Sequence, residues 1–281
     1  MNINDITITS IETITCFGVT SGEYLFTLDE LQSASIAQSQ EVADITGRQG
    51  RRLNSLKRNK AITISGQNGM VSHGLLELQT GSSFTEEASK IMWTDYITVD
   101  TTNGTKTEYV AVGTAGAEIV GMYVHNSDGT LGVSLEQDSS VDEGKFTYDP
   151  TTRELEFYSD IENGTSFVAY YYRNLVANVL MDSASSYSGK CAMYIDAVGE
   201  DKCANIYHVQ IYISKADFNG DFTFDMGDNQ AVHSFEANAL AGTCGNVDGF
   251  FTYTVFGADA EDYTGGDNLV GSAIVGTATA G

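Results

Sequence analysis

The stretch YHVQIYI, residues 207–213, alternates between two sets of side chains. Its first, third, fifth and seventh residues are a tyrosine, a valine and two isoleucines, with histidine, glutamine and tyrosine between them. Side chains two positions apart share one face of a β-strand, so this period predicts a strand with one face on a core. The same period recurs at residues 6–8, 24–28, 62–64 and 250–256.

Turn signals separate these runs. Asn or Asp followed by Gly tolerates the positive φ angles that two-residue hairpin turns need. The single proline, Pro150, agrees with many strands because proline cannot donate to a ladder. We therefore predict a mainly β fold with an antiparallel sandwich or barrel-like architecture. It includes one or two short helices, one over Thr85–Trp93, and Leu28–Gln38 is ambiguous. The turn dipeptides begin at Asn68, Asn103, Asp128, Asn163, Asn219 and Asp248.

Net charge limits what this chain can bind. Its 281 residues include 14 Lys and Arg against 38 Asp and Glu, a formal net charge of −24 at pH 7. This charge excludes a general nucleic-acid binder, which needs a basic face to neutralise phosphates, and disfavours an anionic membrane surface. No stretch approaches roughly 18 apolar residues, so we expect no membrane span. Residues 1–17 show no signal peptide, so we expect synthesis in the cytoplasm.

Composition divides the chain into three segments. Residues 84–173 hold short alternating runs and several turn signals, enough for a small β-sandwich. Strand-forming sequence lies on both sides, so we expect an insertion into a discontinuous β-sandwich domain of residues 1–83 and 174–256. Residues 257–281 are rich in Gly and Ala and form a predicted C-terminal arm. The candidate strands of the insertion are 96–99, 107–112, 118–124, 145–148, 154–158 and 167–172.

Signatures of catalysis, metal binding and cofactor binding are missing from the sequence. No GxSxG or GxxxxGK[ST] motif is present, and no GxGxxG follows a strand. Asp217–Asp221 resembles the start of a calcium loop, but Phe222 and Asp228 stand where such a loop needs Gly and Glu. We therefore expect no enzyme, no metal and no cofactor. The histidines, which lack HxH or HxxxH spacing, are His73, His125, His208 and His233.

Cysteines are too sparse for a disulfide scaffold. Cys16, Cys191, Cys203 and Cys244 form no CxxC pair, and we expect four reduced, half-buried thiols. A bridge between Cys191 and Cys203 would require that these two residues lie on paired strands.

One segment departs from the general acidity. Six of the 14 basic residues lie between Arg48 and Lys60, with no acidic residue among them. One interpretation is a solvated loop beside an edge strand protected by Lys and Arg, and another is a nucleic-acid contact. We favour contact with an acidic patch on another copy, because a strongly acidic protein that self-associates must offset its own repulsion. These residues are Arg48, Arg51, Arg52, Lys57, Arg58 and Lys60.

Several patches resemble bacteriophage tail tube (major tail) proteins. They are residues 44–53, residues 57–65, residues 208–213, residues 222–224 and residues 233–240. Residues 93–173 also look like an insertion seen in some such proteins. The resemblance implies a virion structural protein, made in the host cytoplasm, whose β-sandwich subunits form rings. The rings are commonly hexameric and stack into the tail tube, alongside other tail or head-completion proteins.

Two further expectations follow from the resemblance. A long loop near the N-terminal strands would reach the adjacent ring, and we place it at residues 40–60, with the inserted domain on the exterior. Inner strands would line a channel for genome ejection. Carboxylates facing that channel would repel phosphates, so DNA would pass without specific binding.

Two other functions fit the same composition. A capsid decoration or surface-lattice protein would also be acidic, rich in β-strands and without catalytic motifs. A carbohydrate-binding or receptor-binding β module would use some of the 13 Phe and 15 Tyr as stacking faces. Rings or tubes in electron micrographs would distinguish the tail tube from both.

Overall fold

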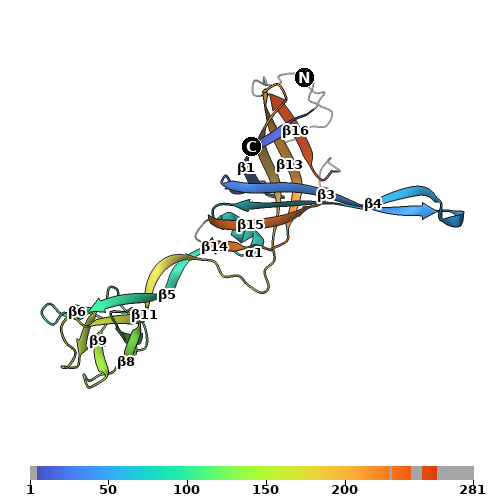
Figure 1. Cartoon of the computed structure of the whole chain (residues 1–281). Coiled ribbons are helices and arrows are strands. Elements are labelled where there is room, and N and C mark those ends of the chain that lie inside the picture. The colour runs from blue at the N-terminus through green and yellow to red at the C-terminus, as the bar shows by residue number, and fades with distance from the viewer. Residues whose placement is uncertain (1–4, 228–229, 242–248, 258–281) are drawn as a thin grey trace, which may run out of the picture. The chain divides into compact units, whose positions relative to one another are not determined.

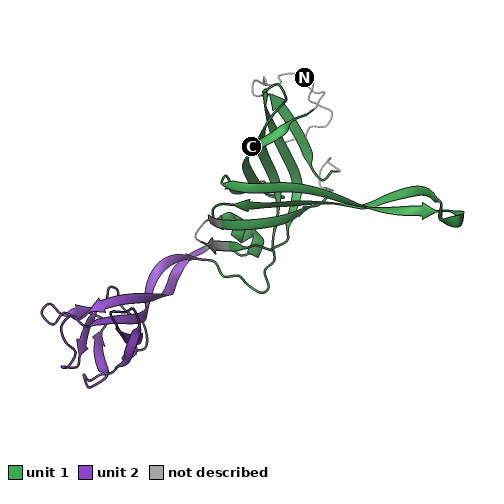
Figure 2. Cartoon of the chain, in the orientation of Figure 1, with its two compact units in different colours: residues 1–84, 180–281 green, residues 85–179 purple. Residues whose placement is uncertain are grey.

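The chain folds into two compact units (Figure 2). The computed structural model describes residues 5–227, 230–241 and 249–257. Unit 1 comprises residues 1–84 and 180–281, and unit 2 comprises residues 85–179. Antiparallel strands dominate both units, and each has its own core, which confirms the predicted mainly β fold class. The predicted C-terminal arm lies outside the described residues from residue 258 onward, as does Asp248.

Among its described residues, unit 1 forms a nine-stranded sheet that curls into a half-barrel (Figure 1). The strand order is β2-β1-β12-β13-β15-β4-β3, with β14 paired to β15 and β16 paired to β13. The strands are β1 (Thr7–Gly18), β2 (Tyr24–Leu28), β3 (Leu31–Thr46), β4 (Arg52–Asn68), β12 (Lys190–Glu200), β13 (Ile206–Phe218), β14 (Phe224–Gly227), β15 (Gln230–Ala239) and β16 (Thr252–Gly257).

Residues 207–213 lie in β13 at the centre of this sheet. Val209 and Ile213 are 1% and 0% exposed, and they pair with core residues of β12, Ala197 and Met193. Side chains on the other face of β13 are half-buried. The predicted alternation is therefore confirmed, and it gives the half-barrel its apolar inner side.

One α-helix, α1 (His73–Thr80), is present among the described residues. The Ser72 hydroxyl accepts a hydrogen bond from the Leu75 N–H (3.3 Å), and Gly81 ends the helix with a left-handed φ of 68°. Leu75 is fully buried in the core of unit 1. Two turns are too short for a clear period, but Ser72 and Gly81 are a recognisable pair of cap residues. No described helix is long and apolar enough to cross a membrane.

The helix predicted over Thr85–Trp93 is wrong. These residues belong to β5 (Thr85–Thr98), which pairs along its whole length with β11 (Ser166–Val179). Leu28–Gln38 is not helical either and divides between the end of β2 and the start of β3. The long ladder satisfies every second backbone group of β5, and this tertiary pairing outweighs a weak local preference for helix.

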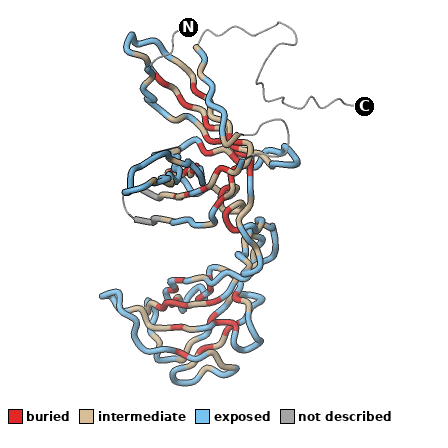
Figure 3. Tube along the Cα trace, turned by 90° about the vertical axis from the view of Figure 1, so that its right-hand side faces the viewer, coloured by how far each residue is buried: buried red, intermediate tan, exposed pale blue. Residues whose placement is uncertain are grey.

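Unit 2 contains seven strands in the order β5-β11-β7-β8-β9-β10-β6, with β8 and β9 parallel. Their core includes Met122, Phe146 and Phe167, each at most 1% exposed. Figure 3 shows buried residues along the strands of both units. Besides β5 and β11, the strands are β6 (Thr105–Lys106), β7 (Ile119–His125), β8 (Leu131–Gln137), β9 (Lys145–Asp149) and β10 (Glu154–Phe157).

Residues 107–112, expected as a strand, are irregular. Side chains rather than a neighbouring strand satisfy part of their backbone. The Glu108 N–H donates to Asp95 Oδ2 (2.7 Å), and the Tyr109 N–H donates to the Tyr171 hydroxyl (3.0 Å). That hydroxyl donates in turn to Asp95 Oδ2 (3.1 Å), and burial raises the pKa of Tyr171. This buried network replaces the ladder that the sequence pattern predicted.

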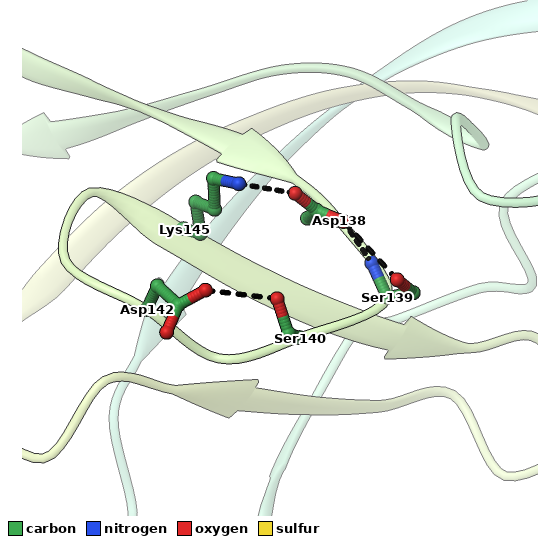
Figure 4. Close-up of polar contacts among 5 residues, drawn as sticks. All are labelled: Asp138, Ser139, Ser140, Asp142 and Lys145. Carbon is green, nitrogen blue, oxygen red and sulfur yellow. Dashed lines mark hydrogen bonds and ion pairs between the residues drawn. The ribbon is translucent and has the colours of Figure 1, made fainter.

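An acidic loop joins β8 to β9 (Figure 4). Lys145 forms an ion pair with Asp138, and this contact lowers the pKa of Asp138 and raises that of Lys145. The Ser139 N–H also donates to Asp138 Oδ1 (2.6 Å), and the Ser140 hydroxyl donates to Asp142 Oδ2 (2.9 Å). These carboxylates therefore serve to shape the loop.

Candidate subunit interface

The candidate interface is the hairpin of β3 and β4, which extends from the sheet of unit 1 (Figure 1). Its pairing slips between Ser39 and Glu41, where β4 carries one more residue than β3 and Asn59 has a left-handed φ of 53°. Such a bulge bends and twists the ribbon. We call residues 40–60, beyond this bulge, the arm.

A short turn closes the arm. A single 3₁₀ turn spans Arg48–Gly50, and the Gly47 N–H donates to the Arg51 carbonyl oxygen (2.8 Å). Gly50 has a φ of 72°, a left-handed conformation that glycine adopts without steric cost. Arg48 and Arg51 are exposed and lie at the tip of the arm.

Two of the six predicted contact residues already have partners within the arm. Arg52 Nη2 lies 2.8 Å from Asp44 Oδ1, and Arg58 Nη2 lies 2.5 Å from Glu41 Oε1. Hydrogen bonds from Arg58 and Asn59 lower the pKa of Glu41. These pairs are exposed and add little stability, but each links β3 to β4. We infer that Arg52 and Arg58 mainly hold the shape of the arm.

The other four basic residues differ from one another. Lys60 Nζ lies 5.5 Å from the centre of the Phe250 ring, a cation–π contact within unit 1. Among the described residues, Arg48, Arg51 and Lys57 form no ion pair. These three charges are therefore the ones available to a second molecule.

Large apolar side chains are also exposed on the arm. Val42, Ile45, Leu53 and Leu56 are 46%, 50%, 69% and 55% exposed. All residues of the arm are described, and none is buried. Sequence reasoning missed these four because apolar residues of a strand are normally assigned to a core. Exposed apolar groups beside unpaired arginines are typical of a protein–protein contact surface.

A second candidate surface is the sheet face opposite the core of unit 1. Thr13, Asp196 and Gln210 form one row across β1, β12 and β13. Gln210 Nε2 donates to Asp196 Oδ1 (2.9 Å), and the Thr13 hydroxyl donates to Asp196 Oδ2 (3.4 Å). In the adjacent row the rings of Tyr194 and Tyr212 lie 4.6 Å apart. This face is polar and carries few charges.

Comparison with known families supplies the context for these surfaces. The sequence model of the YomU/Tube protein family matches residues 6–253. The chain belongs to the YomU/Tube protein family. The match covers both parts of unit 1 and all of unit 2. No curated protein matches the chain. As a YomU/Tube protein it is a structural component of the phage tube type, which confirms the resemblance at the level of the family.

Proposed function

We propose that this protein assembles into stacked rings that form the tube of a phage tail. Six subunits per ring is the number that the tail tube resemblance implies. The tube would conduct the genome during ejection, and the protein would act in the virion after synthesis in the host cytoplasm. Other tail or head-completion proteins would contact the ends of the tube.

The arm is the observation that carries this proposal. It projects from unit 1, exposes four large apolar side chains and presents Arg48, Arg51 and Lys57 without ion-pair partners among the described residues. A two-stranded ribbon with both faces in water is marginally stable, so contact with another surface would order it. Residues 48–60 contain no acidic residue, whereas the rest of the chain has 38 acidic residues. A second copy therefore offers the opposite charge.

The acidity of the chain also suits the channel. Outside residues 48–60 only eight basic residues remain against 38 acidic ones. A channel lined by such a surface repels phosphates, so DNA meets no strong electrostatic minimum along its path. We assign the channel wall to the polar face of β1, β12 and β13, which carries Asp196. Unit 2 would then lie on the exterior.

Charge reversal on the arm tests the proposal. The variant Arg48→Glu/Arg51→Glu/Lys57→Glu changes the three unpartnered charges and leaves the Arg52–Asp44 and Arg58–Glu41 pairs intact. Lys90→Glu/Lys106→Glu/Lys202→Glu is the matched control, because it changes the net charge equally at sites outside the arm. Negative-stain microscopy of concentrated protein measures the length of tubes or stacks, and circular dichroism measures folding.

We expect the wild type and the control to form tubes, and the arm variant to stay folded as subunits or single rings. Tubes of unchanged length from the arm variant would contradict the role of the arm. A wild type that remains a 30 kDa monomer at high concentration would contradict assembly itself.

A further inference from the structure

Two buried thiols of unit 1 lie against each other. Cys191 Sγ is 3.0 Å from Cys16 Sγ, and both residues are 0% exposed. Cys16 lies on β1 and Cys191 on β12, so the contact joins residues 175 positions apart in the chain. Cys203, the partner considered from the sequence, is exposed between β12 and β13, and Cys244 lies outside the described residues.

Strand irregularities account for this close approach. Cys16 pairs with Met193 and Cys191 pairs with Gly18, so the cysteines are diagonal neighbours on one face of the ladder. Diagonal neighbours in a regular sheet are about 7–8 Å apart at their Cα atoms. The β1–β2 ladder slips next to Cys16, and the β12–β13 ladder slips next to Cys191. Bulges of this kind re-aim side chains, and here they turn two sulfur atoms toward each other.

We propose that Cys16 and Cys191 form an intramolecular disulfide when the protein meets a peroxide. Hydrogen peroxide is small and neutral, and therefore suited to reaching a buried pair. It oxidises one thiol to a sulfenic acid and releases one water. The second thiol then attacks that sulfur, forms the S–S bond and releases a second water, so one peroxide is reduced to two waters. The sulfur atoms must close by about 1 Å, since a disulfide bond is roughly 2.05 Å long.

The bond would join the two parts of a discontinuous unit. Residues 1–84 and 180–281 of unit 1 are connected along the chain only through unit 2. A cross-link that closes so long a loop restricts the unfolded chain strongly. Burial raises the pKa of the Cys16 thiol, so reaction is slow and the pair persists as thiols in a reducing cytoplasm. Because both sulfurs are buried, the cross-link changes no exposed side chain of the arm.

The test uses the variant Cys203→Ser/Cys244→Ser, which keeps Cys16 and Cys191 as its only cysteines. The folded protein is treated with hydrogen peroxide, then unfolded, alkylated, digested and analysed by mass spectrometry. We expect one cross-linked peptide pair, lost on reduction with dithiothreitol, and a rise in Tm of roughly 5–10 °C. Adding Cys16→Ala to this variant should abolish both effects.

Two alkylated cysteines after prolonged peroxide treatment would overturn the proposal, as would separate sulfinic acids on Cys16 and Cys191. Peptide mapping of the wild type gives the same answer if the variant folds poorly, because the cross-linked peptides identify which cysteines are joined. A wild-type link from Cys191 to Cys203 would also overturn it.

Discussion

His233 Nε2 lies 2.8 Å from Gln79 Oε1, and this hydrogen bond joins β15 to α1 inside unit 1. The Ser72 N–H donates to His233 Nδ1 (3.3 Å), so Nδ1 is the acceptor and Nε2 carries the proton. Gln79 Nε2 donates in turn to the Ser234 carbonyl oxygen (3.0 Å). His233 is fully buried, and burial lowers its pKa from 6.5 to about 4. The helix is thus held to the sheet by a neutral imidazole.

We expect acid to weaken unit 1 through this histidine. The unfolded chain protonates His233 near pH 6.5, whereas the folded chain does so only near pH 4. The unfolded state therefore binds more protons in this range, and the free energy of unfolding falls as the pH decreases. The loss from this group is at most about 1.4 kcal/mol per pH unit. Urea unfolding between about pH 7 and 5 should show a shallower slope for His233→Gln than for the wild type.

His125→Gln is the matched control for that experiment, because His125 lies on β7 of unit 2 and is only partly buried. Its pH slope should equal that of the wild type. A His233→Gln slope equal to both would show that His233 does not titrate on unfolding.

The variant Tyr171→Phe should destabilise unit 2 by about 1–3 kcal/mol. It removes a hydroxyl that accepts from the Tyr109 N–H and donates to Asp95, so a buried N–H and a buried carboxylate each lose a partner. Thermal unfolding of the full chain provides the measurement. Tyr96→Phe is the control, because Tyr96 is 69% exposed and should tolerate the change. Equal effects of the two substitutions would contradict a role for the buried hydroxyl.

Unit 2 should be removable without loss of assembly. Thr85 pairs with Val179, so the two connections to unit 1 lie side by side. Deleting residues 85–179 and joining Phe84 to Leu180 with a short Gly-Ser linker should leave unit 1 folded and able to form tubes in electron micrographs. Deleting residues 84–173, the limits suggested by the sequence, should be less soluble because it leaves the end of β11 unpaired.

Loss of soluble protein from the deletion of residues 85–179 would show instead that unit 1 needs unit 2 to fold. Soluble protein that forms no tubes would place unit 2 in the subunit contacts.

Assembled tubes should not retain DNA. The surplus of 38 acidic over 14 basic residues leaves little surface that attracts phosphates once the arms are covered by neighbouring subunits. Duplex DNA should therefore migrate unchanged in a gel with tubes at low salt, where electrostatic attraction is least screened. The unassembled control would be protein below its assembly concentration, with the arm exposed. Retention by tubes that declines as salt is added would contradict an acidic, non-binding surface.

The alternation in residues 207–213 was sufficient to predict a buried strand, because it depends only on neighbours in the chain and on the two-residue repeat of a strand. The basic segment and the overall acidity could likewise be read without a structure. The helix expected over Thr85–Trp93 shows the limit of such reasoning. Its residues suit either state locally, and pairing with β11 decided between them.

The sequence by itself determined the β class, the acidic character and the position of the basic segment, since these are properties of composition and short-range period. Only the tertiary structure decided that Arg52 and Arg58 pair within the arm while Arg48, Arg51 and Lys57 have no ion pair among the described residues. It also placed Cys191 against Cys16. The reason is physical: partners far apart in the chain are chosen by the register of whole strands, and no local pattern encodes that register.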